Sequence, residues 1–179
     1  MSDSGEGAAD GWTRLFVKST GILQLDLSVY RDGAFEHQMF SVVGDKHGAK
    51  VMDAAGTVVL TAVVEKAFLA KVEFTNAEGT VVARLNANSV FKKQYMEITL
   101  ASGVEWIVAR SGGLKQFYTV LENDVPVAKL DLKTLPLKYQ YPIDIAEGVD
   151  PSLAVGLAWV INFSHLRRVA GGAGAVAAT

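Results

Sequence analysis

The sequence predicts a mainly β protein: a closed antiparallel barrel of about twelve strands, built from repeated hairpins and enclosing one hydrophobic C-terminal α-helix. Two observations predict this fold class. Turn signals recur at nearly regular intervals, and the runs between them alternate in polarity as hairpin strands do. Near the C-terminus, one segment reads as a helix that is apolar on every side, and such a helix must be buried.

The turn signals are rich in Gly, Asn and Asp, which tolerate the positive φ that tight turns require. The last residues of successive turns fall at 33, 56, 79, 103 and 124, so the spacings are 23, 23, 24 and 21 residues. Such a period predicts tandem two-stranded units. The turns are Asp32–Gly33, Asp53–Gly56, Asn76–Gly79, Ala101–Gly103 and Glu122–Asp124.

Alternating polarity between the turns predicts strands rather than helices. In residues 23–30, 95–100 and 128–133 every second side chain is apolar, which is typical of an antiparallel sheet with one buried face. Because the connections are short, successive strands should pair, and a sheet of this size should close to remove its edges. The predicted strands are 13–18, 23–30, 34–43, 49–53, 57–65, 71–76, 80–88, 94–101, 104–110, 115–122, 125–133 and 138–145.

The predicted helix covers residues 151–168. Asp150 suits the N-cap, Pro151 suits the first helical position, and two arginines near the other end complement the helix dipole. A barrel of about eight strands is filled by its own side chains, so a wider barrel leaves room for a helix about 10–12 Å across. We therefore expect this helix inside the barrel.

A membrane span is the competing reading of this helix, and it needs about 20 largely apolar residues. Here the run without a polar side chain has nine residues, Leu153 to Ile161, and Asn162, Ser164 and His165 interrupt its continuation. We expect the helix to lie in the protein's own core, and we do not expect an integral membrane protein. The net charge of −2 also provides no basic field for a nucleic-acid partner.

The hairpin units share a further pattern, in which an acidic turn is followed by a strand that ends in Ala, a cation and Leu. Residues 74–85 and 118–130 both show it. With one hydrophobic C-terminal helix, this pattern resembles the LURP-one-related family over about residues 12–169. That family belongs to the tubby C-terminal-like group, which includes the phospholipid scramblases. The resemblance implies a closed twelve-stranded barrel around a central helix, and tubby domains bind phosphoinositides.

Length and composition predict a single domain, because the chain has 179 residues, of which 50% are hydrophobic. Residues 1–11 are acidic and Gly/Ala-rich without the features of a signal peptide, so we expect a disordered leader. Residues 12–169 should form the barrel domain, and residues 170–179 a flexible Gly/Ala tail. The chain contains no cysteine, which fits a reducing compartment, and we expect a cytoplasmic location.

The sequence shows no pattern of catalytic or metal-binding residues. The three histidines, His37, His47 and His165, lack the spacing of metal ligands and have no nucleophile motif beside them. Most acidic residues fall in turns, where solvation and turn hydrogen bonds account for them. We therefore predict no catalytic residue, no metal, no cofactor and no enzymatic activity.

Basic residues give the one indication of a ligand. Lys92, Lys93, Arg110 and Lys115 flank or occupy two connections at the same end of the predicted hairpins, and Lys66 and Lys71 bracket an equivalent earlier connection. One interpretation is a binding site for anionic phospholipid headgroups at a barrel rim. Lysines near strand ends can instead protect edges and keep the protein soluble. The alternative function is a regulatory module that binds a protein partner and has no lipid role.

Overall fold

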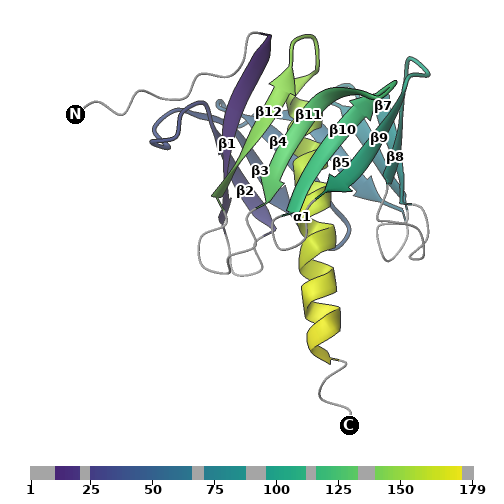
Figure 1. The fold of residues 1–179 in the computed structure, drawn as a ribbon. Helices are drawn as coiled ribbons and strands as arrows, with labels where there is room; N and C mark the ends of the chain where they lie inside the picture. The colour runs from purple at the N-terminus through teal and green to yellow at the C-terminus, as the bar shows by residue number, and fades with distance from the viewer. Residues whose placement is uncertain are drawn as a thin grey trace.

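The computed structural model describes residues 11–20, 25–65, 71–87, 96–111, 116–132 and 140–174. These residues form twelve strands and one helix (Figure 1). The elements are β1 (Trp12–Thr20), β2 (Asp26–Tyr30), β3 (Gln38–Gly44), β4 (Gly48–Asp53), β5 (Val58–Val64), β6 (Lys71–Asn76), β7 (Val81–Ala87), β8 (Met96–Leu100), β9 (Glu105–Ser111), β10 (Gln116–Glu122), β11 (Val125–Leu132), β12 (Gln140–Ala146) and α1 (Pro151–Gly174).

The strands close into an antiparallel barrel, which confirms the predicted fold class. Each strand pairs with its neighbours in the sequence, and β1 pairs with β12 to complete the ring. The closing register runs from Trp12 opposite Ala146 to Lys18 opposite Gln140. Among the described strands, each one therefore has a hydrogen-bonded neighbour on both sides, which removes the free edges of an open sheet.

The repeated turns lie at one end of the barrel, and their glycines have the conformation that the sequence predicts. Gly56, Gly79 and Gly103 have φ between 79° and 85°. Their amides donate to the carbonyl three residues earlier, as from Gly56 to Asp53 at 3.0 Å. In these hairpins a residue with positive φ follows the turn, and glycine adopts that conformation without strain.

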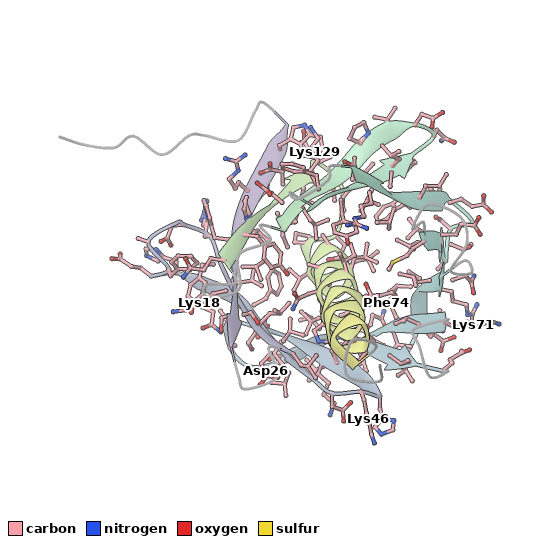
Figure 2. The ribbon with its side chains drawn as sticks, turned by 60° about the horizontal axis from the view of Figure 1, so that its bottom comes forward. Lys18, Asp26, Lys46, Lys71, Phe74 and Lys129 are labelled. Carbon is pink, nitrogen blue, oxygen red and sulfur yellow. The ribbon has the colours of Figure 1, made fainter. Side chains whose placement is uncertain are left out.

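Helix α1 runs through the barrel, as predicted (Figure 1). Every side chain from Ser152 to Ser164 is buried. The helix lies against β3, β4 and β5, where its contacts are most numerous, and Figure 2 shows it beside Phe74 of β6. The barrel therefore supplies the burial that an apolar helix requires.

The helix is longer than the sequence predicts, because its backbone stays helical to Gly174 rather than ending at residue 168. The backbone of residues 170–174, which the sequence assigns to the flexible tail, is thus helical, while residues 1–10 and 175–179 lie outside the described part of the chain. Once a helix is nucleated, each added residue gains a hydrogen bond, so the helix can extend into a Gly/Ala segment. Figure 1 shows these last turns projecting beyond the barrel.

Strand β3 begins later than predicted, at Gln38 instead of residue 34. The preceding residues form a loop, because the Asp32 carboxylate accepts hydrogen bonds from the backbone N–H groups of Glu36 and His37. Phe35 in this loop has a φ of 61°, and its ring lies against the rings of Phe16 and Tyr30 on the outside of the barrel. Side-chain hydrogen bonds of this kind compete with the strand ladder.

Candidate functional site at the exit rim

The two ends of the barrel are chemically different. We call the end at which α1 begins the entry rim and the end at which it leaves the exit rim. Odd-numbered strands end at the exit rim, because the helix follows β12 and the strands alternate in direction. The described turns of the entry rim and the strand ends beside them carry nine carboxylates beside Arg31; they are Asp32, Glu36, Asp53, Glu78, Glu105, Glu122, Asp124, Glu147 and Asp150.

Exposed lysines lie along the half of the exit rim that β1 to β6 form. Lys18 lies near the end of β1, Lys46 lies between β3 and β4, Lys50 lies on β4, and Lys71 begins β6. In Figure 2, which brings this end forward, Lys18, Lys46 and Lys71 point outward at separate places around the barrel. The exit rim is therefore a surface on which several cations can contact one extended anionic partner.

The β3–β4 hairpin carries two of these lysines. Its turn has two central residues, Lys46 and His47, and the Asp45 amide donates to the Gly48 carbonyl at 2.8 Å. The Asp45 carboxylate accepts the backbone N–H of His47 at 2.7 Å and that of Gly48 at 3.1 Å. These hydrogen bonds, the one from His47 first, hold the pKa of Asp45 below its usual value. The carboxylate is thus directed into its own turn.

The carboxylate of a second acidic residue at this rim also accepts a backbone hydrogen bond. Asp26, labelled in Figure 2, accepts a hydrogen bond from the Gly44 amide at 3.1 Å. This contact ties the beginning of β2 to the end of β3. Because both Asp26 and Asp45 bind N–H groups, they stabilise the rim without forming ion pairs with its lysines among the contacts of the described residues.

A shallow pocket of about 210 Å³ lies on the outer wall near the exit rim, across β6 and β7. Lys71, Glu73, Arg84 and Asn86 point outward here, because Val72 and Leu85 between them are buried. Glu73 and Arg84 form an ion pair of 2.9 Å across the two strands. The pocket is lined by Glu65, Lys71, Val72, Glu73, Arg84, Leu85 and Asn86. Its charges balance, so it does not by itself select an anion.

Arg110 is on the inward face of β9 and not on the outer surface of the exit rim. It pairs with Tyr118 on β10 and shares the inward face of β9 with the buried Trp106 and Val108. Its side chain is half-buried on the inner side of the barrel wall. The other predicted binding residues, Lys92, Lys93 and Lys115, lie outside the described residues, as does Lys66. The described strand ends next to them, such as Ala87 and Met96, do lie at the exit rim.

Sequence reasoning missed Lys18, Lys46 and Lys50. A signal for the last two was present, because Lys46-His47 separates two strand-like runs in the manner of a two-residue hairpin turn. Lys50 lies between Ala49 and Val51, both buried, so alternation places it on the outer face. What the sequence could not provide was the spatial grouping of these residues with Lys71.

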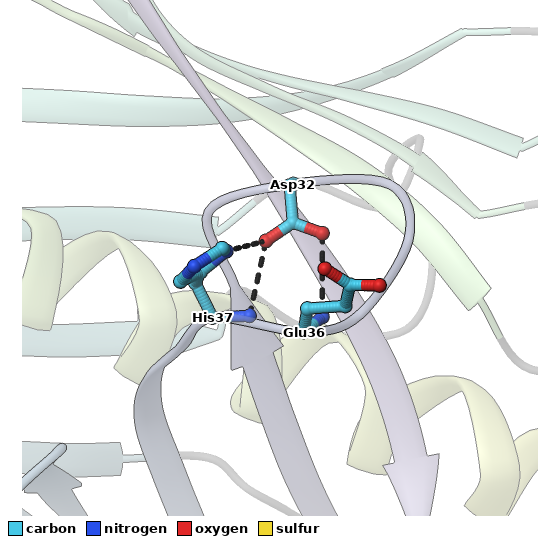
Figure 3. A network of polar contacts seen from close by, with 3 residues as sticks. All are labelled: Asp32, Glu36 and His37. Carbon is cyan, nitrogen blue, oxygen red and sulfur yellow. Dashed lines mark hydrogen bonds and ion pairs between the residues drawn. The ribbon is translucent and has the colours of Figure 1, made fainter.

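The side chain of His37 makes a polar contact at the entry end of the barrel (Figure 3). His37 Nδ1 lies 2.9 Å from Asp32 Oδ2 in the exposed loop between β2 and β3. Partial burial raises the pKa of Asp32, but the hydrogen bonds from Glu36 and His37 outweigh it, and the net pKa is lowered. The contact organises the loop.

The described residues contain neither a metal-binding cluster nor a membrane-spanning helix. No three His, Asp or Glu side chains among them lie close enough together to hold a metal ion. Within the same residues, no helical segment combines the length and the hydrophobicity needed to cross a bilayer.

A family model described as LURP-one-related matches residues 13–162. This range includes all twelve strands, apart from Trp12 at the start of β1, and α1 as far as Asn162. The chain belongs to the LURP-one-related family. Among solved structures, this LURP-one-related chain is similar to the X-ray structure of a protein from Arabidopsis thaliana. The identity is 11%, the match covers 85% of this chain and 91% of that one, and the TM-score is 0.43. A comparison with curated proteins finds no match.

Proposed function

We propose that this protein is a non-enzymatic binding module that recognises anionic phospholipid headgroups through its exit rim, on the cytoplasmic face of a membrane. The observation that carries the proposal is the separation of exposed residues along the barrel axis. Lys18, Lys46, Lys50 and Lys71 lie toward the exit rim, where Asp26 and Asp45 accept backbone N–H groups and Glu65 is the exposed carboxylate after β5, whereas the entry-rim turns carry most of the described turn carboxylates. The resemblance to the tubby C-terminal-like group, whose tubby domains bind phosphoinositides, points the same way.

The distance between the rims makes this separation effective. A seven-residue strand such as β5 spans about 23 Å along its length. Charges in physiological salt are screened over about 8 Å, so an anionic surface at one rim interacts weakly with charges at the other. Each lysine at an anionic surface contributes about 1 kcal/mol. An anionic membrane surface therefore attracts the exit rim and not the entry rim, so the electrostatic interaction also orients the barrel.

Vesicle flotation with the full chain tests the proposal. We expect binding to phosphatidylcholine vesicles that contain phosphatidylserine or phosphoinositides, no binding to phosphatidylcholine alone, and release as salt is raised. Removing two lysines by Lys46→Ala with Lys50→Ala should weaken binding roughly 30-fold, since about 2 kcal/mol is lost.

The matched control compares equal changes of charge at the two rims. Lys46→Glu and Arg31→Glu alter the net charge by the same amount, but Arg31 lies in the entry-rim loop. Only Lys46→Glu should reduce flotation. Equal effects of both variants, or no flotation of the parent protein with any anionic lipid, would contradict the proposal.

The alternative function is a protein-interaction module with no lipid role, and the entry rim is the surface that would serve it. Val125 is the most exposed large apolar residue described, at 62%, and it follows the acidic turn residue Asp124. Such a surface suits a basic partner. Cross-linking in cells should then capture one protein partner, and Asp124→Lys should abolish this capture. Together with a failure of the protein to float with vesicles, this result would favour the alternative function.

A further inference from the structure

Two exposed valines face solvent on the outer wall near the exit rim. Val43 on β3 is 56% exposed and Val63 on β5 is 47% exposed, whereas their neighbours Val42 and Ala62 are buried in the core. Exposed large apolar side chains are unremarkable when they are scattered, but these two flank the same strand. Val43 pairs with Lys50, and Val63 pairs with Gly48, both on β4.

The register on β4 sets what lies beside each valine. Gly48 is the cross-strand partner of Val63, and a Cβ at position 48 would collide with the carbonyl oxygen of Ala62. Position 48 therefore contributes no side chain that could cover Val63. The Val64 amide donates to the His47 carbonyl at 2.8 Å, which holds the β3–β4 turn against β5.

Two lysines complete this surface. Lys50 is the cross-strand partner of Val43, so their Cα atoms are about 5 Å apart, and Lys46 is at the tip of the adjoining turn. We call Val43, Lys46, Lys50 and Val63 the valine–lysine patch. The nearby Asp45 carboxylate accepts hydrogen bonds from its own turn. The patch thus combines apolar side chains with cations in one rigid unit.

We propose that the valine–lysine patch is a shallow membrane-insertion surface, with the valines entering the interfacial region of an anionic bilayer while the lysines contact lipid phosphates. The inference rests on the proposed function and adds how the barrel meets the membrane. Apolar side chains flanked by lysines match the interface of an anionic bilayer. Four side chains are too few for a stable protein interface, which needs about 800 Å² per partner.

The position of the patch predicts a tilted orientation. The valines project from the outer wall of β3 and β5, and not from loop tips along the barrel axis. β10 is six strands away from β4 in the ring of twelve, so it lies on the opposite wall. When β3 and β5 touch the membrane, the wall that contains β10 should stay in water.

Single-cysteine labelling tests this geometry directly, because the chain contains no native cysteine. An environment-sensitive fluorophore is placed by Val43→Cys or Val63→Cys in the full chain. Val125→Cys at the entry rim is one control, and Phe117→Cys on β10 near the exit rim is the other, with residues 62% and 38% exposed. With phosphatidylcholine–phosphatidylserine vesicles, we expect blue shifts at positions 43 and 63 and none at 125 or 117.

A second variant separates insertion from attraction. Val43→Ser with Val63→Ser keeps every charge but should weaken vesicle binding roughly tenfold, because two half-exposed valines no longer leave water. The loss should persist at high salt. The difference in vesicle binding between the parent protein and the Lys46→Ala with Lys50→Ala variant should instead disappear as salt is raised, because salt screens the charges.

The outcomes distinguish the inference from the function on which it rests. If the protein floats with anionic vesicles but labels at 43 and 63 remain in water, the patch inference is overturned and the proposed function stands. A blue shift of the label at position 117 without one at position 43 would also overturn the inference about the valine–lysine patch. If the protein does not float, both fail. Circular dichroism of each variant establishes that the barrel is folded.

Discussion

The indole of Trp159 occupies the space that a side chain at position 44 would need. A Cβ built on Gly44 would lie within 2.7 Å of the indole Cε2. Trp159 is completely buried, and its Nε1 donates to the Leu25 carbonyl at 2.8 Å. Its ring also stacks on that of Phe163, with centroids 5.2 Å apart. The end of β3 and the middle of α1 are thus locked together.

The first prediction concerns this contact. Gly44→Ala should destabilise the fold by about 1–3 kcal/mol, because the added methyl overpacks a rigid core site. Urea unfolding followed by tryptophan fluorescence measures the change. Gly33→Ala is the matched control, since its Cβ would meet the Phe16 ring at an ordinary 3.5 Å. Equal stability of the two variants would show that α1 can shift away from β3.

The second prediction concerns Tyr141, whose buried hydroxyl has no hydrogen-bond partner among the described residues. An unpaired buried hydroxyl costs free energy, so Tyr141→Phe should raise the free energy of unfolding by roughly 1 kcal/mol. Ser164→Ala is the control with the opposite sign, because the Ser164 hydroxyl donates to the Ile161 carbonyl at 2.8 Å. A loss of stability in Tyr141→Phe would mean that the hydroxyl is solvated or paired.

Burial also raises the pKa of Tyr141, which gives a pH dependence. Because the folded state retains the phenol proton, the free energy of unfolding is independent of this group below its unfolded pKa of about 10, and stability is lost as pH rises from that value toward the higher folded pKa. Unfolding of the parent protein between pH 7 and 11 should therefore show a steeper loss of stability than Tyr141→Phe. Parallel curves for the two proteins would contradict the assignment.

The third prediction concerns the beginning of α1. Asp150 Oδ1 accepts hydrogen bonds from both the backbone N–H and the hydroxyl of Ser152, each at 2.8 Å, which confirms the predicted N-cap. Asp150→Ala should cost about 0.5–2 kcal/mol. Asp150→Asn keeps a side-chain acceptor and should recover most of this loss in thermal unfolding. A silent Asp150→Ala would indicate that packing of the apolar helix alone fixes its first turn.

The fourth prediction concerns the loop before β3. Asp32 holds Glu36 and His37, and with them Phe35 at its strained positive φ. The pKa of Asp32 is lowered, so its contribution is present above the unfolded value of about 3.9 and is lost as pH falls through the still lower folded pKa. The protection of the residue 31–37 amides from hydrogen exchange, measured relative to the intrinsic rate at each pH, should fall in acid, and Asp32→Ala should show the same loss of protection at pH 7.

The sequence contained enough local information for the strands and the helix. The spacing of Gly56, Gly79 and Gly103 marked the hairpin turns, because each has a positive φ that glycine adopts without strain. Alternation identified the buried faces, as for Val72 and Phe74 on β6. The prediction went wrong at residues 34–37, where the Asp32 side chain replaces strand pairing by a local loop.

The candidate site depended on tertiary structure to a much greater degree. Arg110 follows a strand, so its position suggested a rim residue, but its register opposite Tyr118 turns it inward. Lys46 and Lys50 join Val43 and Val63 only because β3, β4 and β5 pair in one particular register. A shift by one residue would exchange the inward and outward faces of a strand.

By itself, the sequence determined that the chain forms tandem hairpins around one apolar helix, because turn chemistry and polarity act over a few residues. Only the tertiary structure decided which charges share a rim and which side chains the helix displaces. The pairing of Trp12 with Ala146 closes the barrel across nearly the whole chain, and no local pattern specifies such a contact. That closure places the acidic turns at one end and the valine–lysine patch near the other.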